Sequence, residues 1–418
     1  MPSRRPIVDS RFSRSAVVFL VIGALALGVF SAPYASSAIV ASEICDNCFD
    51  DDGINGADRA DPMCKAPANG NFVGLPDESA AKGAVKCQKA IEKASIAFAT
   101  KKLGRLDKCV ALAFACTQLK NGDQSCIDKA TAACDKQVQG ISGDESKAKA
   151  KIENACDDSQ GGSVSLADIR DVTGLGYSGE ESLLDCAATL SSTSDLADCV
   201  IDRHECGVER VLLASAPRAQ ELLVKLGHNV ATEFPCLAAA AATKGTDGAG
   251  LGLGDAVQAK AAVKCQGAIT KAAVKVTKIG TKNVEKCADA AATCIQLKPG
   301  VASCQTKAAA KCQKTFTKLT AFDGTFAKLI TATAKKCAAP TFGPIQLNAP
   351  AGLGFVAVTD PSKRCSQFNL VFPDPTDQLV ECVSKQYLCD GAYLLEREAP
   401  RLQEYAHFFN ISIDVFGF

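Results

Sequence analysis

Aspartate residues near the N-terminus have the density and spacing of a cation-binding loop. Between Cys45 and Cys64 the chain runs CDNCFDDDGINGADRADPMC. Ca²⁺ takes six to eight oxygen ligands from a flexible loop, and carboxylates interleaved with glycine can supply them. We therefore expect a Ca²⁺ site here, with ligands Asp50, Asp52, Asn55, Asp58 and Asp61. The alternative is an acidic, solvated linker held in place by its flanking cysteines.

This segment resembles the aspartate-rich, cysteine-bracketed repeats of thrombospondin type three and metal-binding stretches of secreted bacterial proteins. The resemblance implies Ca²⁺ ligation by the four aspartates, with Asn55 assisting. The chain departs from the usual alternation at Ile54, where an acidic residue is typical.

Other reactive patterns lack their partner residues. Cys45 and Cys48 form a CxxC pair, but Phe49 stands where a c-type haem requires histidine, and no second CxxC pair completes a zinc ribbon. Gly174-x-Gly176-x-x-Gly179 has the form of a dinucleotide fingerprint, yet it lies in a cysteine-rich helical region instead of a βαβ unit. We expect neither haem nor nucleotide.

Histidine is scarce, and no nucleophile comes with a recognisable base. The three histidines are His204, His228 and His407, and none has a second histidine at ligand spacing. We expect His204 at a partly exposed helical position, and we expect no catalytic activity.

Lysines give the second half of the chain a predicted basic stripe. Between Lys260 and Lys336 there are 15 lysines against three acidic residues, and six recur at helical spacing: Lys260, Lys264, Lys271, Lys275, Lys278 and Lys282. Such a face can bind an anionic polymer or cell-surface component. The alternative is a solvated face on an alanine-rich helix. The zero formal net charge argues against nucleic acid as a partner of the whole chain.

The cysteines reveal how these residues are positioned. Cys87, Cys109, Cys116, Cys126 and Cys134 recur 178 residues later, without a slip, as Cys265, Cys287, Cys294, Cys304 and Cys312. Such self-similarity indicates two tandem copies of one module. Asn121-Gly122 in the first copy and Pro299-Gly300 in the second mark a tight turn between two helices.

An antiparallel hairpin brings together positions whose numbers have a constant sum. The predicted disulfide pairs are Cys116–Cys126, Cys109–Cys134, Cys87–Cys156, Cys294–Cys304, Cys287–Cys312 and Cys265–Cys337. The pairing of the other ten stays open: Cys45, Cys48, Cys64, Cys186, Cys199, Cys206, Cys236, Cys365, Cys382 and Cys389.

The predicted fold is all-α, with two disulfide-stapled helical-hairpin bundles in tandem. On the first helix, Leu103, Leu106, Val110, Phe114 and Thr117 share one face at spacings of three and four. Glycine weakens helices, so we expect breaks at Gly104, Gly140, Gly280 and Gly324, giving four helices per copy.

Two resemblances follow from these cysteines. The stapled hairpin resembles coiled-coil-helix-coiled-coil-helix proteins, although the cysteine spacing differs. The whole chain resembles uncharacterised secreted cysteine-rich tandem-repeat proteins of environmental bacteria, a resemblance that implies no activity.

The N-terminus indicates export. Arginines precede an apolar run from Ala16 to Phe30 and small residues up to Ala38, the pattern of a secretory signal peptide; the alternative is a membrane anchor. Twenty-two cysteines fit an oxidising compartment. The predicted segments are the signal peptide 1–38, the aspartate-rich segment 39–66, repeat unit 1 at 67–236, a Gly/Ala-rich linker 237–258 and repeat unit 2 at 259–418.

These observations predict a secreted or periplasmic structural or binding protein, soluble after signal cleavage. One alternative is a saposin-like carrier of lipid or small apolar ligands, in which stapled helices part around a cavity. A further alternative is an extracellular enzyme.

Overall fold

The computed structural model describes residues 72–157, 164–177, 190–244, 247–320 and 324–338, with shorter stretches at 343, 346–347, 349–355, 399–401, 404–405 and 409. The described residues contain helices and no strand, which confirms the all-α class. The helices are α1 (Glu78–Leu119), α2 (Gln124–Cys156), α3 (Leu166–Arg170), α4 (Thr193–Ser215), α5 (Ala219–Lys225), α6 (Val230–Glu233), α7 (Pro235–Lys244), α8 (Ala256–Leu297), α9 (Ala302–Thr320) and α10 (Thr325–Cys337). None of these helices is long and apolar enough to cross a membrane.

The two predicted turns join long helices. Gly122, with φ +84°, lies between α1 and α2, and Gly300, with φ +72°, lies between α8 and α9. These left-handed conformations suit glycine, which lacks a Cβ. Both long helices also begin alike, because Asp77 and Asp255 accept hydrogen bonds from the first free backbone amides of α1 and α8.

Disulfides hold each hairpin along its length. Six of the pairs in the structure are those that the spacing predicts: Cys87–Cys156, Cys109–Cys134, Cys116–Cys126, Cys265–Cys337, Cys287–Cys312 and Cys294–Cys304. A seventh, Cys206–Cys236, joins α4 to α7 and resolves a pairing that the spacing left open. The described residues contain no free cysteine.

The prediction of glycine breaks is wrong at three of its four positions. α1 continues through Gly104, α2 through Gly140 and α8 through Gly280. Only Gly324 separates two helices, α9 and α10. Glycine costs a helix about 1 kcal/mol relative to alanine, which packing and flanking disulfides outweigh. At Gly140 the missing side chain leaves room for the guanidinium of Arg105.

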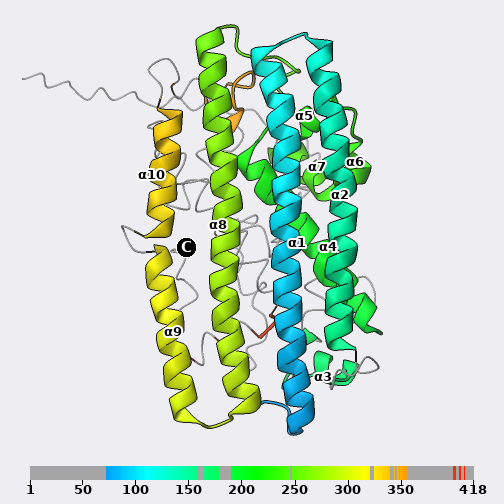
Figure 1. Cartoon of the computed structure of the whole chain (residues 1–418), viewed down its shortest axis with the longest axis vertical. Helices are drawn as coiled ribbons and strands as arrows, with labels where there is room; N and C mark the ends of the chain where they lie inside the picture. Colours follow the sequence, from blue (N-terminus) through cyan, green and yellow to red (C-terminus); the bar gives the residue numbers. More distant parts are fainter. Residues whose placement is uncertain are drawn as a thin grey trace, which may run out of the picture. The chain divides into compact units, whose positions relative to one another are not determined.

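α1 and α8 run side by side at the centre of the helical assembly (Figure 1) and contact each other extensively. The face of α1 predicted from Leu103, Leu106, Val110, Phe114 and Thr117 is buried, each residue being at most 2% exposed. One continuous hydrophobic core includes residues of both repeat units. The units therefore share a core instead of standing as independent bundles.

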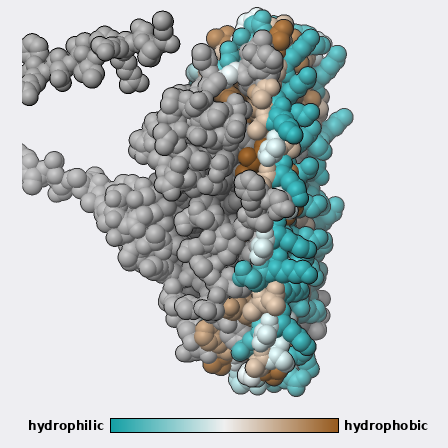
Figure 2. All heavy atoms as spheres, turned by 90° about the vertical axis from the view of Figure 1, so that its left-hand side faces the viewer, coloured by the Kyte–Doolittle hydropathy of each residue, from teal (hydrophilic) through white to brown (hydrophobic). Residues whose placement is uncertain are grey.

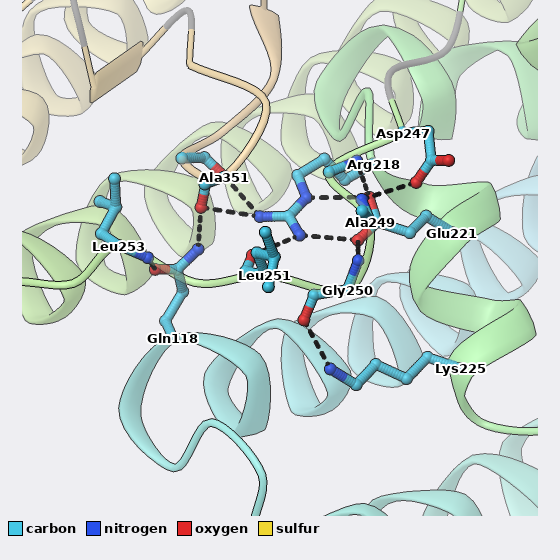
Figure 3. Close-up of polar contacts among 12 residues, drawn as sticks. Gln118, Arg218, Glu221, Lys225, Asp247, Ala249, Gly250, Leu251, Leu253 and Ala351 are labelled. Carbon is cyan, nitrogen blue, oxygen red and sulfur yellow. Dashed lines mark hydrogen bonds and ion pairs between the residues drawn. The ribbon is translucent and has the colours of Figure 1, made fainter.

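A buried arginine, Arg218, joins the two units through a set of hydrogen bonds that we call a clasp (Figure 3). Arg218, which is 1% exposed, donates hydrogen bonds to the carbonyls of Ala351, Gly352 and Leu251 and to the carboxylate of Glu221. Gln118 donates to the Ala351 carbonyl at 2.7 Å and accepts from the backbone amide of Leu253. Residues from repeat unit 1 thus hold backbone from the linker and from repeat unit 2.

A second clasp makes the same contacts in the opposite direction. Arg401 donates to the carbonyls of Thr173, Gly174 and Val73 and to Glu404. Gln296, 178 residues after Gln118, donates to the same Thr173 carbonyl at 2.7 Å. The three carbonyls that accept hydrogen bonds from Arg401 lie 178 residues before the three that accept from Arg218. Each unit therefore binds the other at equivalent positions.

The predicted linker differs from a simple spacer. Its beginning lies in α7, its end lies in α8, and Gly248 and Gly250 between them donate backbone hydrogen bonds to Glu221. Gly252 also lies so close to the α1 backbone that a Cβ there would contact the Thr117 carbonyl. Glycine in this segment serves close backbone approach as well as flexibility.

The clasp predicts a large stability loss on removal of its guanidinium. We expect Arg218→Ala to lower the free energy of unfolding by about 3–5 kcal/mol, because three carbonyls lose their donor and the carboxylate of Glu221 loses its oppositely charged partner. Arg218→Lys restores only part, since an ammonium cannot reproduce the planar fork. Guanidinium denaturation with disulfides intact measures both, with the exposed Lys136→Ala as control. A loss for Arg218→Ala no larger than that of the control would contradict the clasp.

Candidate functional site

The residues predicted to bind Ca²⁺ lie outside the described part of the chain. They are Asp50, Asp52, Asn55, Asp58 and Asp61. The six lysines of the predicted stripe all lie on α8 and are exposed: Lys260, Lys264, Lys271, Lys275, Lys278 and Lys282. On α9, Lys307, Lys311, Lys314 and Lys318 are exposed as well. We call these ten lysines the α8–α9 lysine face.

The helices that carry the lysine face have few acidic residues. Within α8 and α9 the acidic residues are Glu285 and Asp289, and both lie against α1, where Glu92 is their neighbour. None of the ten lysines forms an ion pair in the described part of the chain. α8 thus carries its acids inward and its lysines outward.

In repeat unit 1, some basic residues of the hairpin are paired with carboxylates. Asp144 of α2 pairs with Lys101 and Arg105 of α1 at 2.8 Å each. Lys149 pairs with Glu145 on its own helix and with Asp198 on α4. The two hairpins therefore share their disulfide pairing but differ in the pairing of their surface charges.

A carboxylate cluster lies where α1 meets α8. Glu92, Glu285 and Asp289 each place an oxygen within 4.8 Å of the other two. Glu92 is 1% exposed and Glu285 is 9% exposed, whereas Asp289 is partly exposed. Burial, and next the charge of Asp289, raises the pKa of Glu285; burial also raises the pKa of Asp289.

The prediction from sequence did not include this cluster, although one signal was present. Glu285 and Asp289 are four residues apart, so they share one face of α8 in a segment otherwise rich in lysine. Their meeting with Glu92, nearly 200 residues earlier, depends on the packing of α1 against α8.

The glycine motif is a clasp loop. Gly174 lies so close to the Asp168 carbonyl that a Cβ would overlap it, and Gly176 has φ +81°. The carbonyls of Thr173 and Gly174 accept from Arg401 and Gln296. These contacts account for Gly174 and Gly176 in structural terms, and Gly179 lies outside the described residues.

Two buried ionisable groups of α1 and α4 have structural partners. Lys102, 2% exposed, pairs with Glu209 at 2.7 Å and with Glu205 at 3.0 Å, and Glu209 also accepts from the Leu237 amide. His204 is fully buried, which corrects the expectation of partial exposure; its Nδ1 lies 2.6 Å from the Val200 carbonyl. Helical packing of α4 places this histidine inside.

The fold and these sites define an all-α protein stapled by disulfides, with a charge-asymmetric surface and an internal carboxylate cluster. Its disulfide content fits an extracellular protein. Comparison with protein-family models, curated proteins and solved structures found no match to this chain.

The buried His204 should make the folded protein less stable in mild acid. Burial lowers the pKa of His204 from 6.5 to about 4. Between these values the unfolded chain binds a proton that the folded chain does not, so stability falls as pH drops. We expect this residue to remove about 2 kcal/mol between pH 7.5 and pH 5. Urea denaturation at both pH values measures this change in the free energy of unfolding. In His204→Gln the change should be about 2 kcal/mol smaller than in the native chain. An equal change in both proteins would contradict a low pKa of His204.

Proposed function

We propose that this chain is an exported, disulfide-stapled helical binding protein whose α8–α9 lysine face contacts an anionic polymer of the cell surface or its surroundings. The proposal includes no catalytic activity. The observation that carries it is a difference between the two hairpins: the ten lysines of the lysine face form no ion pair in the described chain, whereas Lys101, Arg105 and Lys149 of α1 and α2 are paired with carboxylates.

Export is supported by two features of different kinds. The arginines and apolar run of the N-terminus are typical of a signal peptide. Seven disulfides among the described residues need an oxidising compartment to persist. The family resemblance to secreted cysteine-rich repeat proteins is part of the same proposal.

The dimensions of the lysine face favour a polymer over a small anion. A helix rises 1.5 Å per residue, so the lysines from Lys260 to Lys282 extend over about 33 Å. This length is several times the Debye length of about 8 Å at physiological ionic strength, so no single small anion neutralises it. In a view onto the side of α9 and α10, hydrophilic side chains follow the length of the described surface (Figure 2).

Charge reversal tests the lysine face. We expect the full chain to bind immobilised heparin, used as a model polyanion, and the variant Lys271→Glu/Lys275→Glu/Lys278→Glu to bind at least about tenfold more weakly. The matched control reverses three exposed lysines of the other half, Lys86, Lys108 and Lys136. Equal weakening by both triple variants would show that net charge alone decides binding and would contradict a specific face.

The aspartate-rich segment is proposed as a Ca²⁺ site of the same protein. Titration calorimetry of the full chain with Ca²⁺ should detect binding that the variant Asp50→Ala/Asp52→Ala reduces, because two carboxylate ligands are lost. Heat that is identical in the native chain and the variant would contradict ligation by these residues.

A further inference from the structure

We propose that protons regulate the α8–α9 lysine face: the carboxylates of Asp107, Glu285 and Asp289 weaken its binding of an anionic polymer at neutral pH, and their protonation in mild acid strengthens it. We call these three residues the seam carboxylates, because they lie where α1 packs against α8 (Figure 1). This inference rests on the proposed polymer binding and adds its regulation. The seam carboxylates act through their charge on neighbouring lysines.

Each seam carboxylate has a lysine of the lysine face as a neighbour that acts on it through its charge. The pairs are Asp107 with Lys271, Glu285 with Lys282 and Asp289 with Lys311. Among the described residues, none of these lysines forms an ion pair. A Coulomb interaction is mutual, so an ionised carboxylate lowers the positive potential at its lysine. Each ionised seam carboxylate therefore weakens the attraction of the face for an anion.

Crowding favours protonation at one end of the seam. Glu92, Glu285 and Asp289 each place an oxygen within 4.8 Å of the other two, and Asp289 is hydrogen-bonded to Glu92. A hydrogen bond between two carboxyl groups requires a proton on one of them. Crowded carboxyl groups do not all ionise together, so this end of the seam takes up protons more readily than isolated carboxylates do.

Burial acts in the same direction on all three seam carboxylates. It is the largest cause that raises the pKa of Asp107 and Asp289 above 3.8 and the pKa of Glu285 above 4.5. A carboxyl group with a raised pKa loses its negative charge as the pH falls through that pKa. Lysine stays protonated at every pH below about 10, so the net positive charge along the face increases in mild acid.

Other charged groups also face the seam carboxylates. Lys108 faces Asp107, which is hydrogen-bonded to Thr270; Lys93 and Lys286 face Glu285; Lys89 and Lys93 face Asp289; and Glu92 acts in turn on the buried Tyr405. The lysines favour the ionised carboxylates. Burial outweighs them, because the pKa of each seam carboxylate is raised and not lowered.

Polymer binding and protonation favour each other. An anionic polymer on the lysine face cancels part of the positive potential of the lysines, and the seam carboxylates then bind protons more tightly. Linkage makes the effect reciprocal, so a protonated seam raises the affinity for the polymer by the same factor. Polymer binding at a pH within this titration should therefore take up protons from solution.

Heparin binding by the full chain with disulfides intact tests the regulation, at pH 7.5 and pH 5 and one ionic strength. The sulfate groups of heparin stay ionised at both pH values. We expect the native chain to bind at least about threefold more tightly at pH 5. The variant Asp107→Asn/Glu285→Gln/Asp289→Asn should bind more tightly than the native chain at pH 7.5 and lose most of this pH dependence. Calorimetry in two buffers of different ionisation enthalpy should show less proton uptake by the variant.

The matched control removes three negative charges elsewhere. Asp128→Asn/Asp198→Asn/Asp202→Asn changes exposed residues of α2 and α4 and should keep the pH dependence of the native chain. Circular dichroism at both pH values checks that the helices remain. Where the triple seam variant does not fold, Glu285→Gln/Asp289→Asn replaces it, with Asp128→Asn/Asp202→Asn as its control.

The outcomes separate this inference from the proposed function. Suppose that heparin binding is weakened by Lys271→Glu/Lys275→Glu/Lys278→Glu, yet its pH dependence is equal in the native chain and the seam variant. The regulation is then overturned and the proposed function stands. Equal loss of pH dependence in the seam variant and the control also overturns the regulation, because net charge alone then decides. Absence of heparin binding at both pH values overturns both.

Discussion

The buried guanidinium groups of Arg218 and Arg401 are the interaction on which the relation between the two halves depends. A charge inside a protein is tolerated only with full compensation, and each arginine finds it in a glutamate and three backbone carbonyls. All six carbonyls belong to the other repeat unit or to the linker that precedes it. Neither unit can therefore satisfy its own arginine, and the shared core of α1 and α8 follows from the same mutual arrangement.

The distribution of charge then distinguishes two halves that share their disulfide pairing and their clasps. α8 separates its charges across its width, with Glu285 and Asp289 against α1 and lysines toward solvent. α1 and α2 instead pair their charges across the hairpin, as Asp144 does with Lys101 and Arg105. The disulfides and the clasps occur in both halves, whereas the α8–α9 lysine face and the carboxylates Glu285 and Asp289 belong to the second half. Surface binding is accordingly proposed for α8 and α9.

The disulfide pairs of the hairpins could be predicted from the sequence. A turn at Gly122 or Gly300, with a helix on each side, determines which cysteines face each other. The glycine breaks were wrong because propensity is a weak local term, and packing carries α1, α2 and α8 through their glycines. The contacts of the linker could not be predicted for a related reason. Its glycines allow backbone to approach Gln118 and Glu221, contacts that local composition does not encode.

The sequence alone determined the all-α class, the hairpins, the cysteine pairs and the exposed lysines of α8, since each depends on periodicity or on residues joined by a short turn. The tertiary structure alone decided which helix lies against which. Glu92 meets Glu285 and Asp289, His204 becomes buried, and Arg218 reaches Ala351 only after distant segments pack. Those contacts depend on the shape and burial of the whole core, which no local pattern specifies.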